Sequence, residues 1–256
     1  MLAVSSPQCA ATWSDFTAEL DSIAASGRTA VFWWRDDDAT QPGAALDRLL
    51  RTAESHPLAL AVIPVGATAA LAERLDDTEN ITVLQHGFRH ANHAPATEKK
   101  AEFGAHRPQS AMLAEIDDGR ARLEDLFGDR FLPLFVPPWN RIASELPAAL
   151  TDRGYCGVSC FGRRQSGAAR RTINCHIDPI DWRGSRGFIG TETVLGHLID
   201  QLAARRTGAP PEPLGFLTHH LDHDAGGWRF IEDLLDATQD HPAVAWRSAA
   251  TVAADF

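Results

Sequence analysis

Short apolar runs of strand length alternate with segments of helical periodicity along most of this chain of 256 residues. The runs that we expect to form strands are residues 29–35, 58–64, 81–85, 131–136, 155–160, 172–177, 214–218 and 243–246. The segments that we expect to form helices are residues 43–56, 67–75, 108–128, 191–205 and 228–237. This alternation predicts an α/β fold with a parallel sheet. Seven or eight strands favour a closed or nearly closed barrel over an open sheet, although periodicity alone does not distinguish these two architectures.

Composition narrows the class of protein. Apolar residues make up 44% and charged residues 23%, which is typical of a globular chain, and the length suffices for a single domain over residues 1–256. With 24 basic against 34 acidic residues the net charge is -10, which disfavours binding to nucleic acid or to an anionic membrane. We recognise neither an export signal nor a membrane span, so a cytoplasmic protein is expected.

The first apolar run ends in three consecutive carboxylates, Asp36, Asp37 and Asp38. Like charges this close repel one another, and a metal, an arginine or a proton commonly offsets that cost. The alternative is a solvated turn that caps the next helix.

Three histidines follow the third apolar run, in the sequence VLQHGFRHANH. His86 and His90 are four residues apart, so a helical turn would place both imidazoles on one face. Two imidazoles and one carboxylate form the three-ligand site that catalytic zinc prefers, although nickel, cobalt, iron or manganese could occupy it. His93 either lines the pocket or caps the loop.

A second histidine cluster, LGFLTHHLDHD, follows the apolar run at residues 214–218. His219 is nearest to the strand and is the best candidate to protonate a leaving group. For His220, His223 and Asp224 we favour solvent-facing loop positions.

Two further segments bring polar and aromatic groups to predicted strand ends. FVPPWNR (135–141) is a rigid turn, because paired prolines restrict the backbone, and it could direct an N–H towards an oxyanion. DPIDW (178–182) either contributes Trp182 to the pocket or holds a buried tryptophan beside a capped turn.

In order along the chain, RDDDA (35–39), HGFRH (86–90), PPWN (137–140), DPIDW (178–182) and LTHH (217–220) resemble the successive motifs of the polysaccharide deacetylases, the NodB-homology carbohydrate esterases of family 4. The resemblance spans about residues 30–224. It implies a single-domain distorted (β/α) barrel of about seven strands, with a divalent metal, and a hydrolase that removes acetyl groups from N-acetylated sugars or related amides using metal-activated water.

The resemblance also implies roles for individual residues. Asp37 corresponds to the general base and Asp38 to a metal ligand, together with His86 and His90. Trp139 corresponds to the aromatic residue whose N–H binds the oxyanion. His219 corresponds to the general acid, although His220 remains open for that role.

The chain departs from the family at the proline turn, where Val136 replaces the usual arginine partner of the base. Arg35 or Arg141 could substitute, and both are expected near the substrate with His93 and Trp182. The substrate is expected to be a small molecule or a short glycan. Two alternatives stay open: a cytoplasmic hydrolase of a small non-sugar amide or ureide, and a non-catalytic sugar-binding relative. Nothing in the sequence indicates the oligomeric state.

Overall fold

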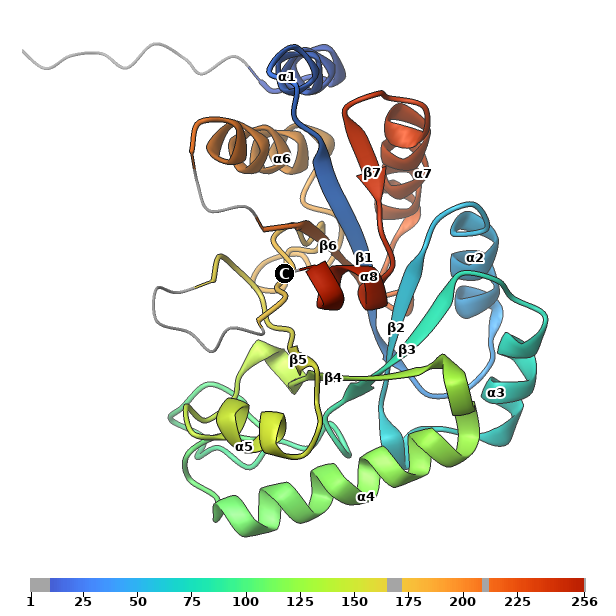
Figure 1. Cartoon of the computed structure of the whole chain (residues 1–256), viewed down its shortest axis with the longest axis vertical. Helices are drawn as coiled ribbons and strands as arrows, with labels where there is room; N and C mark the ends of the chain where they lie inside the picture. Colours follow the sequence, from blue (N-terminus) through green and yellow to red (C-terminus); the bar gives the residue numbers. More distant parts are fainter. Residues whose placement is uncertain (1–9, 165–171, 209–211, 256) are drawn as a thin grey trace, which may run out of the picture. The chain divides into compact units, whose positions relative to one another are not determined.

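The computed structural model describes residues 10–164, 172–208 and 212–255, and its chain divides into two compact units. The larger unit contains residues 31–176, 212–221 and 246–256, and the smaller unit is built from residues 1–30, 177–211 and 222–245. Each unit is described by itself (Figure 1). That the chain forms a single domain stays a prediction.

The larger unit is built on parallel strands in the order β5-β4-β3-β2-β1-β6. The strands are β1 (Ala30–Ala39), β2 (Leu58–Val62), β3 (Ile81–His86), β4 (Phe131–Val136), β5 (Gly157–Val158) and β6 (Leu214–Thr218). A seventh strand of the sheet, β7 (Val244–Trp246), lies off this path. The predicted α/β class with a parallel sheet is confirmed.

An irregular segment over residues 172–176 fills the place between the two outer strands, β5 and β6. The Ile173 N–H donates to the Val158 carbonyl at 3.0 Å, and the His176 N–H donates to the Gly215 carbonyl at 2.7 Å. Residues 172–177 were expected to form a strand, but they make only isolated bridges and no regular strand. The segment nevertheless completes the ring, and this irregularity makes the barrel a distorted one.

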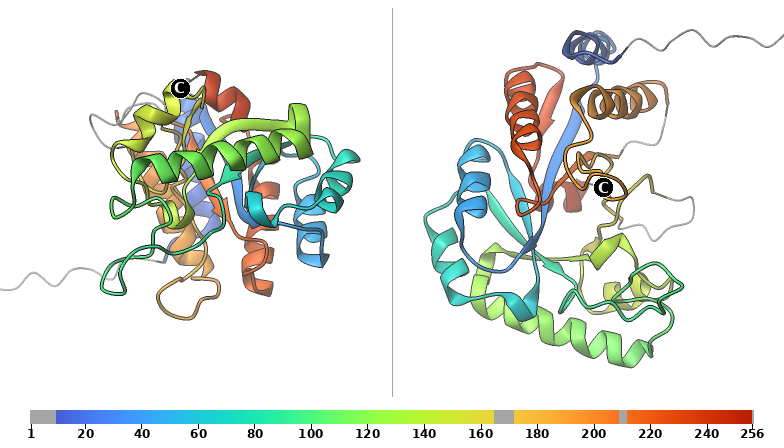
Figure 2. Two further views of the ribbon diagram at one scale, coloured as in Figure 1. Left: turned by 90° about the horizontal axis from the view of Figure 1, so that it is seen from below. Right: turned by 180° about the vertical axis from the view of Figure 1, so that it is seen from behind.

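Helices cover the outside of the sheet in the larger unit, and Figure 2 shows them from two further sides. They are α2 (Ala44–Thr52), α3 (Ala69–Asp76), α4 (Gln109–Phe127) and α5 (Leu146–Asp152). A further helix, α8 (Ala249–Asp255), packs against the residues inside the barrel. The amphipathic pattern located α2, α3 and α4 because each buries regularly spaced leucines or other apolar side chains. The short helices α5 and α8 were not predicted, since seven residues provide too little periodicity.

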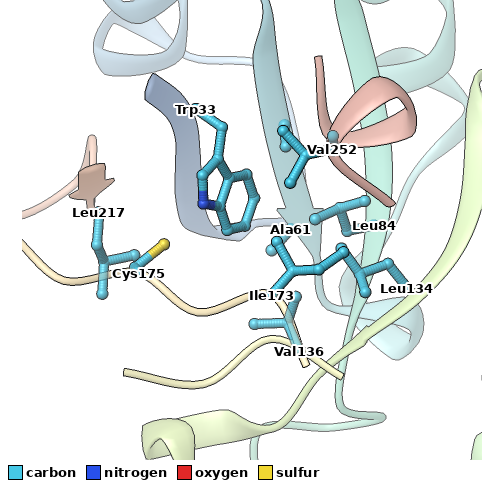
Figure 3. Packing of buried hydrophobic residues seen from close by; sticks show 11 residues of the cluster. Trp33, Ala61, Leu84, Leu134, Val136, Ile173, Cys175, Leu217 and Val252 are labelled. Atoms are coloured by element: carbon cyan, nitrogen blue, oxygen red, sulfur yellow. The ribbon is translucent and has the colours of Figure 1, made fainter. Parts of the chain in front are cut away.

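Every second residue of the strands faces the barrel interior, where side chains from all sides form one cluster (Figure 3). Trp33, Leu84, Val136 and Leu217 contribute from four strands, and Val252 contributes from helix α8. Because side chains alternate along a strand, the same inward face continues two residues further at each strand. On β1, β3 and β6 it carries the polar residues Arg35, His86 and His219.

The smaller unit contains three helices, α1 (Trp13–Ala25), α6 (Thr191–Arg206) and α7 (Ala225–Gln239). Arg206 contacts both carboxylate oxygens of Glu19, at 2.7 and 3.2 Å, which joins α6 to α1. The rings of Trp13 and Phe230 stack at 5.5 Å and join α1 to α7. The sequence predicted α6 and α7 but not α1. None of the helices described is both long and apolar enough to cross a membrane.

Shortening a side chain inside the barrel should destabilise the protein strongly. Leu84→Ala removes a fully buried side chain from the interior cluster, so we expect the free energy of unfolding to fall by about 2–5 kcal/mol. The control is Leu221→Ala, since Leu221 is 64% exposed and should change stability by less than about 0.5 kcal/mol. Urea unfolding followed by circular dichroism measures both, and equal losses would contradict the described packing.

Candidate metal centre

Three side chains converge at the carboxyl ends of β1 and β3. The Asp38 Oδ1 atom lies 3.1 Å from the His86 Nε2 atom and 3.4 Å from the His90 Nε2 atom. One ligand atom from each residue lies within 4.8 Å of the others. The structure therefore contains a possible Asp–His–His metal site, composed of the three residues expected from the sequence.

Asp38 reaches this position because β1 carries a bulge. Asp36 pairs with Leu60 while Ala39 pairs with Val62, so β1 has one residue more than β2 over this stretch. Asp38 takes up the extra residue with a φ of 75°, a conformation that aspartate tolerates better than most residues. The bulge breaks the alternation of the strand, and Asp38 turns towards the two histidines.

The hydrogen bonds of His86 determine which of its ring nitrogens can bind a cation. The His86 Nδ1 atom lies 3.0 Å from the Val136 carbonyl, which can only accept, so Nδ1 carries a proton. In the neutral ring Nε2 is then a lone-pair acceptor, 3.1 Å from a carboxylate oxygen of Asp38. Two acceptors at this distance require a cation or a proton between them. The donor set thus fits a divalent metal ion.

The pKa values of the three residues reflect this crowding. Burial alone would raise the pKa of Asp38, but the hydrogen bond with His86 and the nearby histidines hold it well below its ordinary value. Burial opposes the charged form of His86 too, yet the carboxylates of Asp37 and Asp38 raise its pKa above the ordinary 6.5. Burial and the neighbouring His86 lower the pKa of His90, which favours the neutral imidazole that a metal requires.

A buried carboxylate that the sequence did not indicate, Glu102, holds the loop between the two histidines. It accepts hydrogen bonds from the backbone N–H groups of Phe88, Arg89 and Ala91 at 3.2, 2.8 and 3.3 Å. Gly87 fits beneath it with a φ of 59°, where a Cβ atom would lie 2.3 Å from the Glu102 Oε2 atom. Glu102 lies in a long loop without any local pattern, so no sequence signal located it.

Arg35 is completely buried and pairs with Asp37 through two contacts. The Nε atom lies 2.9 Å from Asp37 Oδ1, and Nη2 lies 3.0 Å from Asp37 Oδ2. The guanidinium also donates to the Ser159 carbonyl and hydroxyl at 3.0 and 2.6 Å, and to Asn140 Oδ1 at 2.8 Å. Of the two arginines considered for the place left by Val136, Arg35 is the one that contacts the Asp37 carboxylate.

The proline turn places Trp139 against the triad. Trp139 and Asn140 have φ values of 55° and 56° within the short 3-10 turn Pro138–Asn140 (η3). The Trp139 ring packs on the His90 ring with a centroid distance of 4.4 Å. The backbone N–H of Trp139 lies in the first turn of this helix, where N–H groups have no acceptor within the helix.

The two adjacent histidines after β6 face different ways. His219 continues the inward face of Leu217, is 9% exposed and contributes to lowering the pKa of Asp38. His220 is buried, with its Nδ1 atom 2.5 Å from Asp36 Oδ1. Our expectation of a solvent-facing His220 is therefore wrong, because the buried carboxylate of Asp36 needs partners to offset its desolvation.

Asp36 belongs to a second network, on the outward face of β1. The Thr218 hydroxyl donates to Asp36 Oδ2 at 2.6 Å, and the Trp34 Nε1–H donates to the Thr218 hydroxyl at 2.8 Å. Alternation along the strand thus separates the three aspartates, with Asp36 outside, Asp37 inside and Asp38 turned by the bulge.

The remaining predicted residues of the larger unit are not brought into the triad. His93 is exposed, and its backbone N–H donates to the Ala101 carbonyl at 3.0 Å, which agrees with a role in shaping the loop. Arg141 donates to the Lys100 carbonyl at 2.7 Å and not to Asp37.

Trp182, His223 and Asp224 belong to the smaller unit. The Trp182 Nε1–H donates to Asp178 at 2.8 Å, and its side chain is 36% exposed instead of buried. Asp224 is exposed and caps α7 by accepting from the Gly227 N–H at 2.8 Å, whereas His223 is half-buried against Trp228. A contribution of Trp182 to substrate binding stays a prediction.

Comparison with known proteins identifies structures with the same fold. The chain matches no protein-family model and no curated protein sequence. A solved structure from Mycobacterium smegmatis, assigned as a polysaccharide deacetylase, matches with a TM-score of 0.66 and 14% identity over 89% of this chain and 90% of that chain. PuuE allantoinase matches with a TM-score of 0.65 and 13% identity over 89% of both chains.

A family 4 carbohydrate esterase from Streptomyces lividans, in complex with acetate, matches with a TM-score of 0.53 and 15% identity over 85% of this chain and 90% of that chain. The fold is thus that of the distorted (β/α) barrels found in polysaccharide deacetylases, family 4 carbohydrate esterases and an allantoinase. The resemblance that the sequence motifs indicated is confirmed at the level of the fold.

Replacing Glu102 should disturb the triad from a distance. In Glu102→Gln one carboxylate oxygen becomes an NH2 group that faces backbone donors, so we expect a loss of about 1–3 kcal/mol in stability. Zinc affinity, measured by titration, should fall as the loop that carries His90 relaxes. Glu98→Gln in the same loop is the control, since Glu98 is exposed. If both variants bind zinc like the parent protein, Glu102 does not position the triad.

Proposed function

We propose that this protein is a metal-dependent hydrolase of amide bonds. The observation that carries the proposal is the pair of acceptor atoms, Asp38 Oδ1 and His86 Nε2, held 3.1 Å apart beside His90 at the carboxyl ends of barrel strands. These acceptor atoms repel one another, so a bound cation would stabilise the arrangement. Enzymes with parallel barrels have their active sites at this end of the strands.

Asp38, His86 and His90 would hold the ion, and zinc is the metal that one carboxylate and two imidazoles suit best. Nickel, cobalt, iron or manganese could also bind to this donor set. A divalent ion held there supplies Lewis acidity, which polarises a carbonyl and lowers the pKa of water.

Asp37 acts as the general base that takes a proton from the attacking water. Its carboxylate is 2% exposed and is held by two contacts with Arg35, which fix its orientation. The positive charge of Arg35 offsets the cost of burying the Asp37 carboxylate. Arg35 therefore holds the carboxylate in a fixed orientation for proton transfer.

Trp139 and His219 stabilise the two further charges that develop during the reaction, on the carbonyl oxygen and on the departing amine. The Trp139 N–H donates a hydrogen bond to the carbonyl oxygen as negative charge develops on it. His219, on the inward face beyond Leu217, protonates the departing amine. His220 is the weaker candidate for this proton transfer, because its Nδ1 atom is engaged with Asp36 on the outward face.

The first candidate substrate is an N-acetylated sugar or a related amide, supported by the deacetylases and esterases among the structural neighbours. A small non-sugar amide or ureide is the second, because an allantoinase is also among the structural neighbours, with a TM-score of 0.65. Arg35 weakens the case for a non-catalytic relative, because it supplies the partner of the base that Val136 cannot.

Changing the base should abolish turnover and leave the metal in place. Asp37→Asn keeps an acceptor for Arg35 but cannot take a proton, so we expect turnover to fall about 10²–10⁴-fold. Activity is measured on the best substrate from a panel of N-acetylated sugars, small amides and ureides, and bound zinc by elemental analysis. Asp38→Asn, the matched control, should lose the metal as well. Full activity of Asp37→Asn would refute its role as the base.

Metal affinity should depend on pH with a definite sign. A metal requires the neutral Nε2 atom of His86, whose pKa without a metal lies above 6.5, so protons compete with the metal from neutral pH downwards. We expect zinc affinity to fall by about tenfold or more between about pH 8 and about pH 6. Competition titrations with a chromophoric chelator, corrected for the chelator's own protonation, measure this fall. A constant affinity would show that His86 is not a ligand.

A further inference from the structure

The chain contains only two lysines, Lys99 and Lys100, among its 24 basic residues, and they are adjacent. Both lie in the loop that follows His90. The Lys100 ammonium lies over the Trp139 ring, 5.8 Å from its centroid. Trp139 also packs on His90 at 4.4 Å, so one indole ring contacts both a metal-ligand candidate and a cation.

Backbone hydrogen bonds on both sides fix the position of Lys100. Arg141, which directly follows the proline turn, donates to the Lys100 carbonyl at 2.7 Å. The next residue, Ala101, donates to the side chain of Asn92 at 3.0 Å and accepts from the His93 N–H at 3.0 Å. The lysine is therefore attached to the turn that carries Trp139 and to the loop that carries His90.

The charge of Lys100 is not neutralised by a carboxylate in the part of the chain that the structure describes. Arg35, Arg107 and Arg206 each pair with an acidic side chain, whereas other cations of the described residues, such as Lys99 and Arg141, form no such pair either. What distinguishes Lys100 is its position, because its ammonium lies over the Trp139 ring that packs on His90 of the candidate metal centre.

We propose that Lys100 binds an anionic group of the substrate, so that the amide cleaved at the metal centre carries a carboxylate. This inference rests on the proposed function, because it places the carboxylate relative to the metal triad. Lysine suits the task, since its compact charge on a flexible stem can follow substrates of different length. The face of Trp139 stabilises the ammonium while the site is empty.

A competing explanation is that Lys100 only packs on Trp139 and supports the turn. The two roles differ in what they predict for ligands of different charge. A support for the turn affects neutral and anionic ligands equally. A recognition residue affects only the anionic ligand, and its effect weakens with salt.

The test compares two metal-binding probes that differ by one carboxylate, benzohydroxamate and 4-carboxybenzohydroxamate. Isothermal titration of the full-length, zinc-loaded protein measures the Kd of each, so the readout does not depend on turnover. We expect the carboxylated probe to bind about fivefold or more tightly at low salt, which is the size of effect that a partly exposed ion pair provides. Raising the salt concentration should reduce this preference.

Variants of the two lysines complete the test. Lys100→Met keeps a flexible apolar stem over Trp139 and should bring the two Kd values together, while Lys100→Arg should keep most of the preference. Lys99→Met is the matched control and should bind both probes like the parent protein. An equal loss of affinity for both probes in Lys100→Met would show that the lysine only supports the turn.

The outcomes also separate this inference from the proposed function. If both probes bind with equal Kd in the parent protein, Lys100 does not recognise the anion, while the metal centre stands. If neither probe binds to protein that has been offered zinc, the metal centre itself is refuted, and the inference falls with it.

Discussion

The buried charge of Arg35 is the constraint on which the site depends. A guanidinium with no exposed surface must find partners for its donors, and it finds them in Asp37 on β1, in Ser159 after β5 and in Asn140 of the proline turn. Removing one partner of a buried ion pair costs about 3–5 kcal/mol, because the other charge remains buried. One side chain therefore holds together the proposed base and the turn that carries Trp139.

The polar residues of the sequence RDDD are distributed between the two faces of β1. Arg35 and Asp37 point into the barrel, whereas Asp36 joins Thr218 and His220 on the outer face. The outer network links β1 to the end of β6, from which His219 continues towards the interior. The general-acid candidate is thus anchored by its neighbour: with His220 tied to β1, the backbone at His219 has little freedom.

Much of this arrangement could be predicted, because strand ends and alternation are properties of the local sequence. The apolar runs located all seven of the described strands, although β1 continues to Ala39 and the eighth run, 172–177, forms no regular strand. The strand ends placed Asp38, His86 and His219 at one edge of the sheet. The bulge at Asp38 could not be predicted, since it depends on how β1 pairs with β2. Neither could Glu102 or the burial of His220, because their partners are backbone groups or side chains that only the folded chain brings near.

Net charge is a guide to long-range attraction and a poor guide to what a site binds. Screening confines the influence of an exposed charge to about 10 Å at moderate salt, so the total of -10 is not what a ligand in contact with the site experiences. At contact distance the local groups decide. Around the triad these include the cation of Lys100 and the backbone donor of Trp139, both of which favour negative charge. An acidic chain can therefore select an anionic substrate, provided that a cation such as Lys100 lies where the substrate is cleaved.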